Sequence, residues 1–168
     1  MVRTCGLPAV VDQSTRVLVL GTMPGGRSLA AGQYYAHRQN RFWRIMSRVL
    51  GRDFDVDYAR RTGLLLQAGV GLWDVLECCE RPDSSLDARI VRGSEVPNDF
   101  RTCLDDHPSI RAFALNGTKA AQLFERLAPV PVASRVDMLR LPSTSPANTR
   151  ISLDQQVEQW RRLAPFLE

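Results

Sequence analysis

Short, mostly apolar runs alternate along the chain with longer segments whose apolar residues recur every three or four positions. The apolar runs are residues 16–20 (RVLVL), 69–76 (GVGLWDVL), 110–115 (IRAFAL) and 136–141 (VDMLRL). Runs of this length are typical of strands that are covered on both faces, as in a parallel sheet. The pattern therefore predicts strands at these four places.

The segments between these runs have the spacing of amphipathic helices. In residues 41–50 the apolar side chains fall on one helical stripe and the Arg side chains on another, and Gly51 ends the pattern. Ser152 and Gln155 form a capping-box pattern at the start of a C-terminal helix. Further helices are predicted at residues 58–68, 97–107 and 118–127, and residues 77–97 are expected to be an irregular excursion with a short helix.

Strands that alternate with helices favour parallel strands joined by helical crossovers. We therefore predict an α/β fold, a three-layer α/β/α sandwich with a central, mostly parallel sheet. No repeat, low-complexity tract or long linker divides the sequence, so a single domain over residues 1–168 is expected. In such folds ligands bind beyond the carboxyl ends of the strands, so the loops that follow the apolar runs are the places to look for function.

The charge allows a polyanionic partner without requiring one. The 22 basic residues exceed the 18 acidic residues, which gives a formal net charge of +4. Every basic side chain except Lys119 is Arg. Arg suits phosphate contacts because its planar fork binds two oxygens at once, but a GC-rich genome would give the same bias.

The sequence has 4 cysteines, and none of them form a C-x-x-C pair. A zinc or iron–sulfur site is therefore not expected, and we predict reduced thiols in a cytoplasmic protein. The apolar stretch near the N-terminus is too short for a signal peptide, and no segment has the length of a membrane helix. We expect neither a metal nor another cofactor, no membrane association, and a monomer.

Residues 20–43 contain an unusual density of Gly, aromatic, amide and Arg residues. The Gly-rich turn after the first predicted strand lacks the Gly-Lys-Ser/Thr ending of a phosphate-binding loop, and its alternative role is that of a tight turn only. Tyr35 is the best candidate to stack on a base. Asn40 is a candidate for catalysis and equally a favoured helix N-cap. His37 could act as a general base or be structural.

Residues 141–148 (LPSTSPAN) resemble the first stretch in one respect: a predicted strand runs directly into a polar loop. Its short hydroxyl and amide side chains are of the kind that hold DNA phosphates, although a solvated loop is the alternative. Asn116, after the third strand, could read a base edge or form an Asn-Gly turn. Asp74, at the end of the second strand, could activate water or cap a helix.

Five motifs together resemble the uracil-DNA glycosylase superfamily: GTMPGGRS, YYAHRQNRFW, GLWDVLECCER, LNG and LPSTSPAN, in this order. The resemblance is closest to the hypoxanthine-DNA (deoxyinosine) glycosylase branch and extends to the mismatch-specific uracil/thymine glycosylases. It implies the same α/β/α fold and DNA containing deaminated bases as the partner. Members flip a damaged base out of duplex DNA and hydrolyse its N-glycosidic bond.

The resemblance also implies residue roles. Asn40 would position the attacking water, Tyr35 would stack on the flipped base, and Met23 stands where relatives have Asn or Asp. Methionine cannot orient or activate water, so another polar group must do so. The base-binding candidates are Gly21, Met23 (through its backbone), Tyr35 and Asn116, and the DNA-binding candidates are Gly25, Arg38, Arg41, Ser143, Thr144, Ser145 and Asn148.

Two other functions remain open at this point. The lost amide at Met23 would suit a non-catalytic protein that binds nucleic acid or a nucleotide on the same fold. A hydrolase that uses Ser143 or Ser145 is less well supported, because no carboxylate or His lies close to these serines in the sequence. The resemblance implies a glycosylase for hypoxanthine, uracil or both. We expect it to be monofunctional, because Lys119 is the one side chain that could offer an amine nucleophile and it lies in a predicted helix.

Overall fold

A computed structural model describes residues 2–82, 85–128 and 130–168. Its centre is a four-stranded sheet in the order β3-β2-β6-β7, and every neighbouring pair in it is parallel. The strands are β2 (Val17–Gly21), β3 (Val70–Asp74), β6 (Ala112–Asn116) and β7 (Asp137–Leu141). These strands lie within or one residue beyond the four apolar runs, so the predicted parallel sheet is confirmed.

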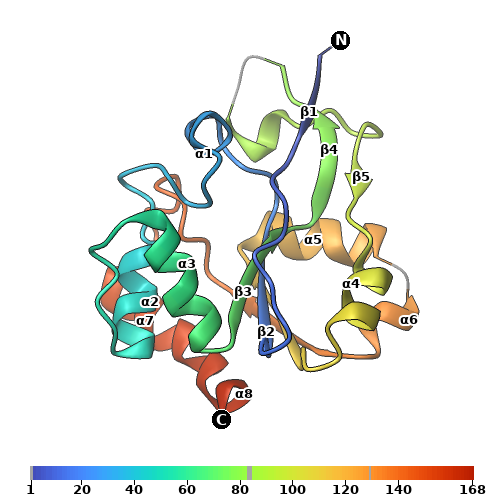
Figure 1. Cartoon of the computed structure of the whole chain (residues 1–168). Coiled ribbons are helices and arrows are strands. Elements are labelled where there is room, and N and C mark those ends of the chain that lie inside the picture. The colour runs from blue at the N-terminus through green and yellow to red at the C-terminus, as the bar shows by residue number, and fades with distance from the viewer. Residues whose placement is uncertain (1, 83–84, 129) are drawn as a thin grey trace.

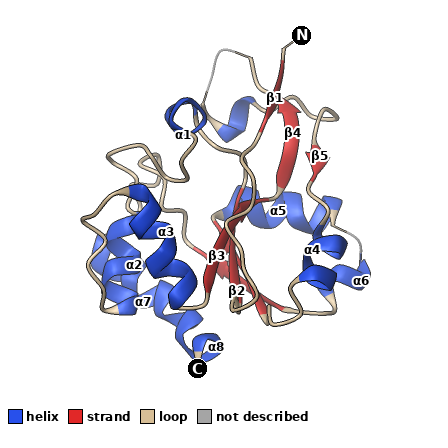
Figure 2. Cartoon of the chain, viewed as in Figure 1, coloured by secondary structure: helices blue, strands red, loops and turns tan. Residues whose placement is uncertain are grey.

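Helices cover both faces of this sheet (Figures 1 and 2). One layer contains α2 (Phe42–Leu50), α3 (Tyr58–Gln67) and α7 (Leu153–Trp160), and the other contains α4 (Phe100–Asp106) and α5 (Thr118–Leu127). Strand β2 serves both layers because Val17 and Val19 join one apolar core while Leu18 and Leu20 join the other. The three-layer α/β/α sandwich predicted from the sequence is therefore confirmed.

The predicted helix boundaries agree with the structure where local signals define them. The capping box of Ser152 and Gln155 is present, with both of its hydrogen bonds. Gly51 ends α2 in the left-handed conformation, which glycine adopts without a steric cost. Shorter helices complete the chain: α1 (Gly26–Ala31), η1 (Asp87–Arg89), α6 (Val130–Ala133), η2 (Arg161–Leu163) and α8 (Ala164–Leu167). Among the described residues, no helix is long and apolar enough to cross a membrane.

A second, antiparallel sheet lies above the parallel one in Figure 1 and was not predicted. It has the order β1-β4-β5 and consists of β1 (Arg3–Cys5), β4 (Leu76–Glu80) and β5 (Val96–Pro97). Cys5 pairs opposite Cys78 across β1 and β4, and the two form a disulfide. The prediction of reduced thiols is therefore wrong for this pair, whereas Cys79 and Cys103 are free and buried. Adjacent strand residues point to opposite faces, which explains the different fates of Cys78 and Cys79.

We predict that the Cys5–Cys78 disulfide stabilises the fold by restricting the unfolded chain. It closes a loop with a sequence separation of 73 residues, for which the chain-entropy relation gives about 4 kcal/mol. Urea unfolding with and without a thiol reductant measures the difference. The Cys5→Ser variant is the control, because its unfolding should not respond to reductant. Equal midpoints for oxidised and reduced protein would contradict the prediction.

Candidate active site

Polar residues from neighbouring strands meet at the carboxyl edge of the parallel sheet. Gly21 ends β2 directly opposite Asp74, which ends β3. Asn116 ends β6, the next strand along, and Thr144 follows the end of β7. Because all four strands run in the same direction, their last residues collect at one edge. The sequence prediction that function lies beyond these strand ends therefore has a defined place in the fold.

Asn116 joins this edge to two segments: the first loop, which is residues 22–41 between β2 and α2, and the last loop, which is residues 142–152 between β7 and α7. Its Nδ2 group donates to Tyr35 Oη at 3.1 Å and to Thr144 Oγ1 at 3.0 Å, and its Oδ1 accepts from the Thr144 backbone N–H at 3.0 Å. Both amide hydrogens are used, while one carbonyl lone pair remains. Thr144 is only 1% exposed. Asn116 and Thr144 thus brace the edge, and the remaining lone pair is what Asn116 could offer to a ligand.

Tyr35 has an unusual backbone conformation with φ of 56°, the one positive value at a non-glycine residue in the described chain. Its ring stacks on Phe42 with centroids 4.1 Å apart, and its hydroxyl group turns toward Asn116. Burial and the nearby Asp74 raise the pKa of the Tyr35 hydroxyl, so this group stays neutral and can hydrogen-bond. A positive φ costs on the order of 1–3 kcal/mol and is retained where the surroundings enforce it. The stacking on Phe42 and the hydrogen bond with Asn116 hold Tyr35 in this strained conformation, with its hydroxyl group at the strand ends.

Asp74 is the buried acid of this edge, with a relative exposure of 5%. A Cβ atom at residue 21 would lie 2.5 Å from Asp74 Oδ1 and 3.6 Å from Tyr35 Oη, so only glycine fits there. Asp74 Oδ2 is buried and has no hydrogen-bond partner among the residues that the structure describes. Burial, aided by the negative charge of Asp87, raises the pKa of Asp74 to about 8, although Arg81 opposes the shift. Burial therefore favours the protonated, neutral form of the Asp74 carboxyl group. Asp74 caps no described helix because β4 follows it.

Asn40 lies one residue before Arg41, which is the N-cap of α2, so the expectation that Asn40 is itself the N-cap is wrong. Asn40 Oδ1 nevertheless accepts from the backbone N–H of Phe42, the first residue of α2, at 3.0 Å, and this donor fixes which amide atom is the oxygen. No other hydrogen bond of the side chain is found among the described residues, so its nitrogen and a second oxygen lone pair are left for a ligand. The half-buried side chain can therefore support the start of α2 and still contact a water molecule.

The first loop and the last loop are bonded to each other beside Asn40. The backbone N–H of Arg41 donates to the backbone oxygen of Thr144 at 3.0 Å. The Arg41 guanidinium donates to Gln156 Oε1 at 2.7 Å, and Gln156 Nε2 donates to the backbone oxygen of Ser143 at 2.7 Å. Asn148 Nδ2 also donates to this backbone oxygen of Ser143. The last loop is thus held rigidly next to Asn40.

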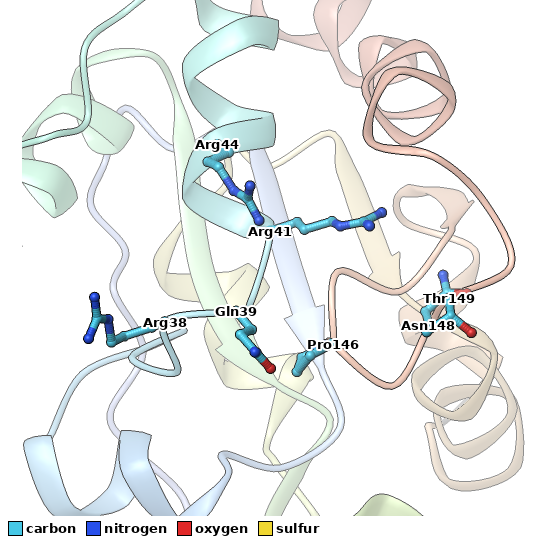
Figure 3. Close-up of a pocket in the computed structure, with 7 residues that line it drawn as sticks. All are labelled: Arg38, Gln39, Arg41, Arg44, Pro146, Asn148 and Thr149. Atoms are coloured by element: carbon cyan, nitrogen blue, oxygen red, sulfur yellow. The ribbon is translucent and has the colours of Figure 1, made fainter.

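A basic hollow of about 490 Å³ opens between these loops (Figure 3). Its lining comes from the start of α2 and from the last loop: Arg38, Gln39, Arg41, Arg44, Pro146, Asn148 and Thr149. Arg38 and Arg44 are exposed and form no ion pair within the described part of the chain. Asn40 is flanked by lining residues but is not itself among them. The structure therefore brings Arg38, Arg41 and Asn148 together as an anion-attracting surface.

The remaining candidate residues have side chains that lie in the core or bind the backbone of their own segment. Met23 turns its side chain into the core that contains Phe100, so only its backbone faces the edge. Gly25 precedes α1 and accepts from Leu29, and the neighbouring Gly26 N–H donates to Ser85. Ser143 and Ser145 hydroxyl oxygens accept from backbone N–H groups in their own loop. His37 Nδ1 accepts from the backbone N–H of Gln39, which is a local turn contact.

Comparison with known proteins identifies the family of this chain. The family model of the uracil DNA glycosylase superfamily matches residues 8–164. The chain belongs to this superfamily. It is 34% identical over 154 residues to a hypoxanthine DNA glycosylase of Methanosarcina acetivorans, covering 91% of this chain and 93% of the relative. It is 33% identical over 156 residues to a hypoxanthine DNA glycosylase of Methanosarcina barkeri, covering 92% and 94%.

A solved structure of the uracil DNA glycosylase superfamily has the same fold. The solution NMR structure of a candidate uracil DNA glycosylase from Methanosarcina acetivorans matches with a TM-score of 0.79 and 31% sequence identity. The match covers 97% of this chain and 99% of that chain. The resemblance seen in the motifs is therefore confirmed, whereas the roles of individual residues stay predictions.

Sequence reasoning considered Asp74 but did not select it, and it did not identify Arg44. The signal for Asp74 was an acid at the end of an otherwise apolar strand, which is a costly residue to bury. The signal for Arg44 was its place one turn after Arg41 on the Arg stripe of α2. Neither pattern alone reveals the cavity or the burial that gives these residues their importance.

We predict that Asp74→Asn makes the fold progressively more stable than the wild type as pH rises. The unfolded state releases the Asp74 proton near pH 3.8 and the folded state near pH 8, so the wild type loses stability throughout this window. The difference in unfolding free energy should grow in favour of the variant by at most about 1.4 kcal/mol per pH unit. Urea unfolding across the window measures it, with the surface variant Asp105→Asn as control. A difference that is independent of pH would disprove the raised pKa.

Proposed function

We propose that this protein is a monofunctional DNA glycosylase that hydrolyses the N-glycosidic bond of deaminated bases, hypoxanthine and/or uracil, and leaves an abasic site. The observation that carries the proposal is the buried carboxyl group of Asp74, which lies near Tyr35 at the strand ends and whose Oδ2 has no hydrogen-bond partner among the described residues. The hypoxanthine DNA glycosylases from the two Methanosarcina species, which match almost the whole chain, support it. Monomeric state, cytoplasmic location and independence from cofactors stay predictions.

A neutral carboxyl group suits the edge that deaminated bases share. Deamination converts an amino-bearing ring edge into a lactam, in which a ring N–H donor lies beside a carbonyl acceptor. The Asp74 carboxyl carries one O–H donor and one carbonyl acceptor when protonated, so it can form two hydrogen bonds with a lactam. Hypoxanthine and uracil both present this edge. Asp74 therefore selects the lactam class, and the space around Tyr35 decides between purine and pyrimidine.

The chemical step needs charge stabilisation more than a strong base. As the glycosidic bond breaks, its electron pair passes to the base and the sugar becomes oxocarbenium-like. The Asp74 O–H bond to the base carbonyl strengthens as the base becomes anionic, which favours the transition state over the ground state. Asn40 holds a water molecule whose oxygen bonds to C1′, while the proton of that water passes to solvent or to the departing base. A carboxamide can orient water in this way without removing its proton early.

The DNA strand is held by the loops on either side of Asn40. Arg38 and Arg44 face the basic hollow and can neutralise phosphates near the flipped nucleotide. The last loop contributes Ser143, Ser145 and backbone N–H groups, which position the strand without reading its sequence. Flipping costs a few kcal/mol and is cheapest for a mispaired base, so weakened pairing adds to the selection at Asp74.

The alternative of a non-catalytic binder is favoured by the position of Met23, whose side chain lies in the core. A duplex with one inosine, incubated with the protein and then treated with alkali, separates the two functions. A glycosylase produces strand cleavage only after alkali, and a parallel uracil duplex measures base preference. A covalent adduct trapped by borohydride would show that an amine of the protein attacks the sugar and would exclude the monofunctional mechanism. Intact strands with both bases would favour the binder.

We predict that Asn40→Ala lowers the single-turnover excision rate by about 10²-fold or more, while affinity for the lesion-bearing duplex is nearly unchanged. The loss reflects the missing water-positioning carboxamide. Asn40→Ser is the matched control, because its hydroxyl group can still cap α2 but cannot replace the amide. Recovery of the excision rate in Asn40→Ser would reduce Asn40 to a helix cap.

We predict that Arg44 contacts a DNA phosphate. Arg44→Ala should reduce the slope of log affinity against log salt concentration by about 0.9 for lesion-free duplex. The control is Arg101→Ala, which removes an exposed Arg from α4 on the opposite helical layer. Fluorescence anisotropy across a salt series gives both slopes. A slope equal to that of the wild type would remove Arg44 from the DNA interface.

A further inference from the structure

The turn at the start of the first loop, residues 22–25, is held from behind by a buried arginine for which the proposed mechanism has no task. Arg81 directly follows β4, and its side chain is only 2% exposed. Arg81 Nη2 donates to the backbone oxygen of Pro24 at 2.5 Å, and Arg81 Nη1 lies 3.8 Å from Asp87 Oδ1. A guanidinium group next to the antiparallel sheet is therefore in direct contact with the loop into which β2 leads.

The centre of this turn depends on Arg81 for its hydrogen bonding. Backbone hydrogen bonds fix the oxygen of Thr22 before the centre and the oxygen of Gly25 after it. Between them, among the described residues, the Met23 backbone has no hydrogen bond and the Pro24 oxygen bonds only to Arg81. Pro24 has no N–H group, so this oxygen is its only backbone group that can form a hydrogen bond. Loss of Arg81 would therefore leave the centre of the turn without any hydrogen bond of its own.

The contact with Arg81 also sets the direction of the next peptide group. The peptide bond between Pro24 and Gly25 is trans, so its carbonyl and its N–H group point in opposite directions. Because the carbonyl points at Arg81, the Gly25 N–H points away from the buried guanidinium. Within the described chain, the N–H groups of Met23 and Gly25 have no hydrogen-bond partner. The turn thus offers two unpaired N–H groups, and Arg81 fixes the peptide plane of one of them.

A contribution to stability alone does not explain a guanidinium group at this place. Arg81 Nε and Nη1 are buried and have no hydrogen-bond partner among the residues that the structure describes. Burial of a charged group with unmade hydrogen bonds is costly, and apolar side chains of similar volume often stabilise a fold as well or better. The contact with Pro24 is the one hydrogen bond of this side chain in the described structure. The distinctive result of an Arg at residue 81 is therefore the fixed turn.

We propose that Arg81 is a positioning residue for base excision: it clamps Pro24 and so holds the N–H groups of Met23 and Gly25 where they contact the flipped nucleotide. The inference rests on the proposed function, in which the base enters at the strand ends. Arg81 itself touches neither the base nor the sugar and acts through the turn. A displacement of about 1 Å at such contacts can cost about 10²-fold in rate, so one clamp on the turn is enough to affect the reaction.

The first test is the single-turnover excision rate on inosine duplex, measured against enzyme concentration. Arg81→Met should lower the maximal rate by about tenfold or more. The half-saturating concentration and the affinity for lesion-free duplex should stay unchanged, because the turn meets the nucleotide only after flipping. Arg81→Lys keeps the charge and an N–H donor, and should recover most of the rate. Arg135→Met, which removes a surface ion pair with Asp105, is the control and should excise like the wild type.

The second test observes the turn directly and does not depend on activity. In nitrogen-15 NMR spectra of the DNA-free protein, the backbone N–H signals of Met23 and Gly25 should shift or broaden in Arg81→Met. Signals of Thr144 in the last loop should stay in place. A residue with a merely structural role would lower the unfolding midpoint without this selective change in the turn. Arg81→Gln, whose side chain is two atoms too short to replace the guanidinium, repeats both tests if Arg81→Met does not fold.

The two tests separate the possible failures. A maximal rate equal to that of the wild type in Arg81→Met or Arg81→Gln, or unmoved signals of the turn, overturns the proposal. If neither of these variants folds while Arg81→Lys does, Arg81 is a residue of the fold only, and the proposal is likewise overturned. Absence of excision by the wild-type protein on both inosine and uracil duplexes overturns the proposed function, whereas the NMR spectra still decide whether Arg81 sets the turn.

Discussion

At the carboxyl edge of the sheet, the carboxyl group of Asp74 occupies the space in which any side chain at residue 21 would lie. The contact exists because β2 and β3 are parallel neighbours that end in register, with Gly21 opposite Asp74. It forces glycine at the start of the first loop and buries the acid below that loop. The raised pKa of Asp74 follows from this burial. The chemistry available at the edge is therefore set by strand register.

The two loops on this edge are ordered by each other rather than by either strand alone. Thr144 accepts from the Arg41 backbone and exchanges two hydrogen bonds with Asn116, which in turn holds the hydroxyl group of Tyr35. These bonds, and the stacking of Tyr35 on Phe42, compensate for the strained backbone of Tyr35. Under the proposed function, a preorganised site of this kind would need little rearrangement on binding a base, which would favour the transition state.

Local signals in the sequence were enough to predict the parallel sheet and most helices, because periodicity and caps act over a few residues. Helix α5 begins and ends where the pattern places it, at Thr118 and Leu127. The antiparallel sheet escaped prediction since β1 and β5 are too short to show alternation, and the Cys5–Cys78 pairing joins residues that are far apart in sequence. At the site, the order of the motifs indicated the superfamily, and the structure brings two of these motif loops together at the sheet edge. The protonation of Asp74 depends on burial and on neighbours from other segments, which no local pattern contains.

Because Met23 offers no polar side chain to the site, the proposed contacts with water and with the base come from two other residues. Its side chain lies in the core that contains Phe100, so Met23 presents only its backbone to the edge. Asn40 approaches from the start of α2 and can hold water, whereas Asp74 approaches from β3 and can hold the base. These two side chains come from separate elements, and Arg81 anchors the turn after β2 through the backbone oxygen of Pro24. Changes at Asn40 and at Asp74 would therefore be expected to affect water and base one at a time.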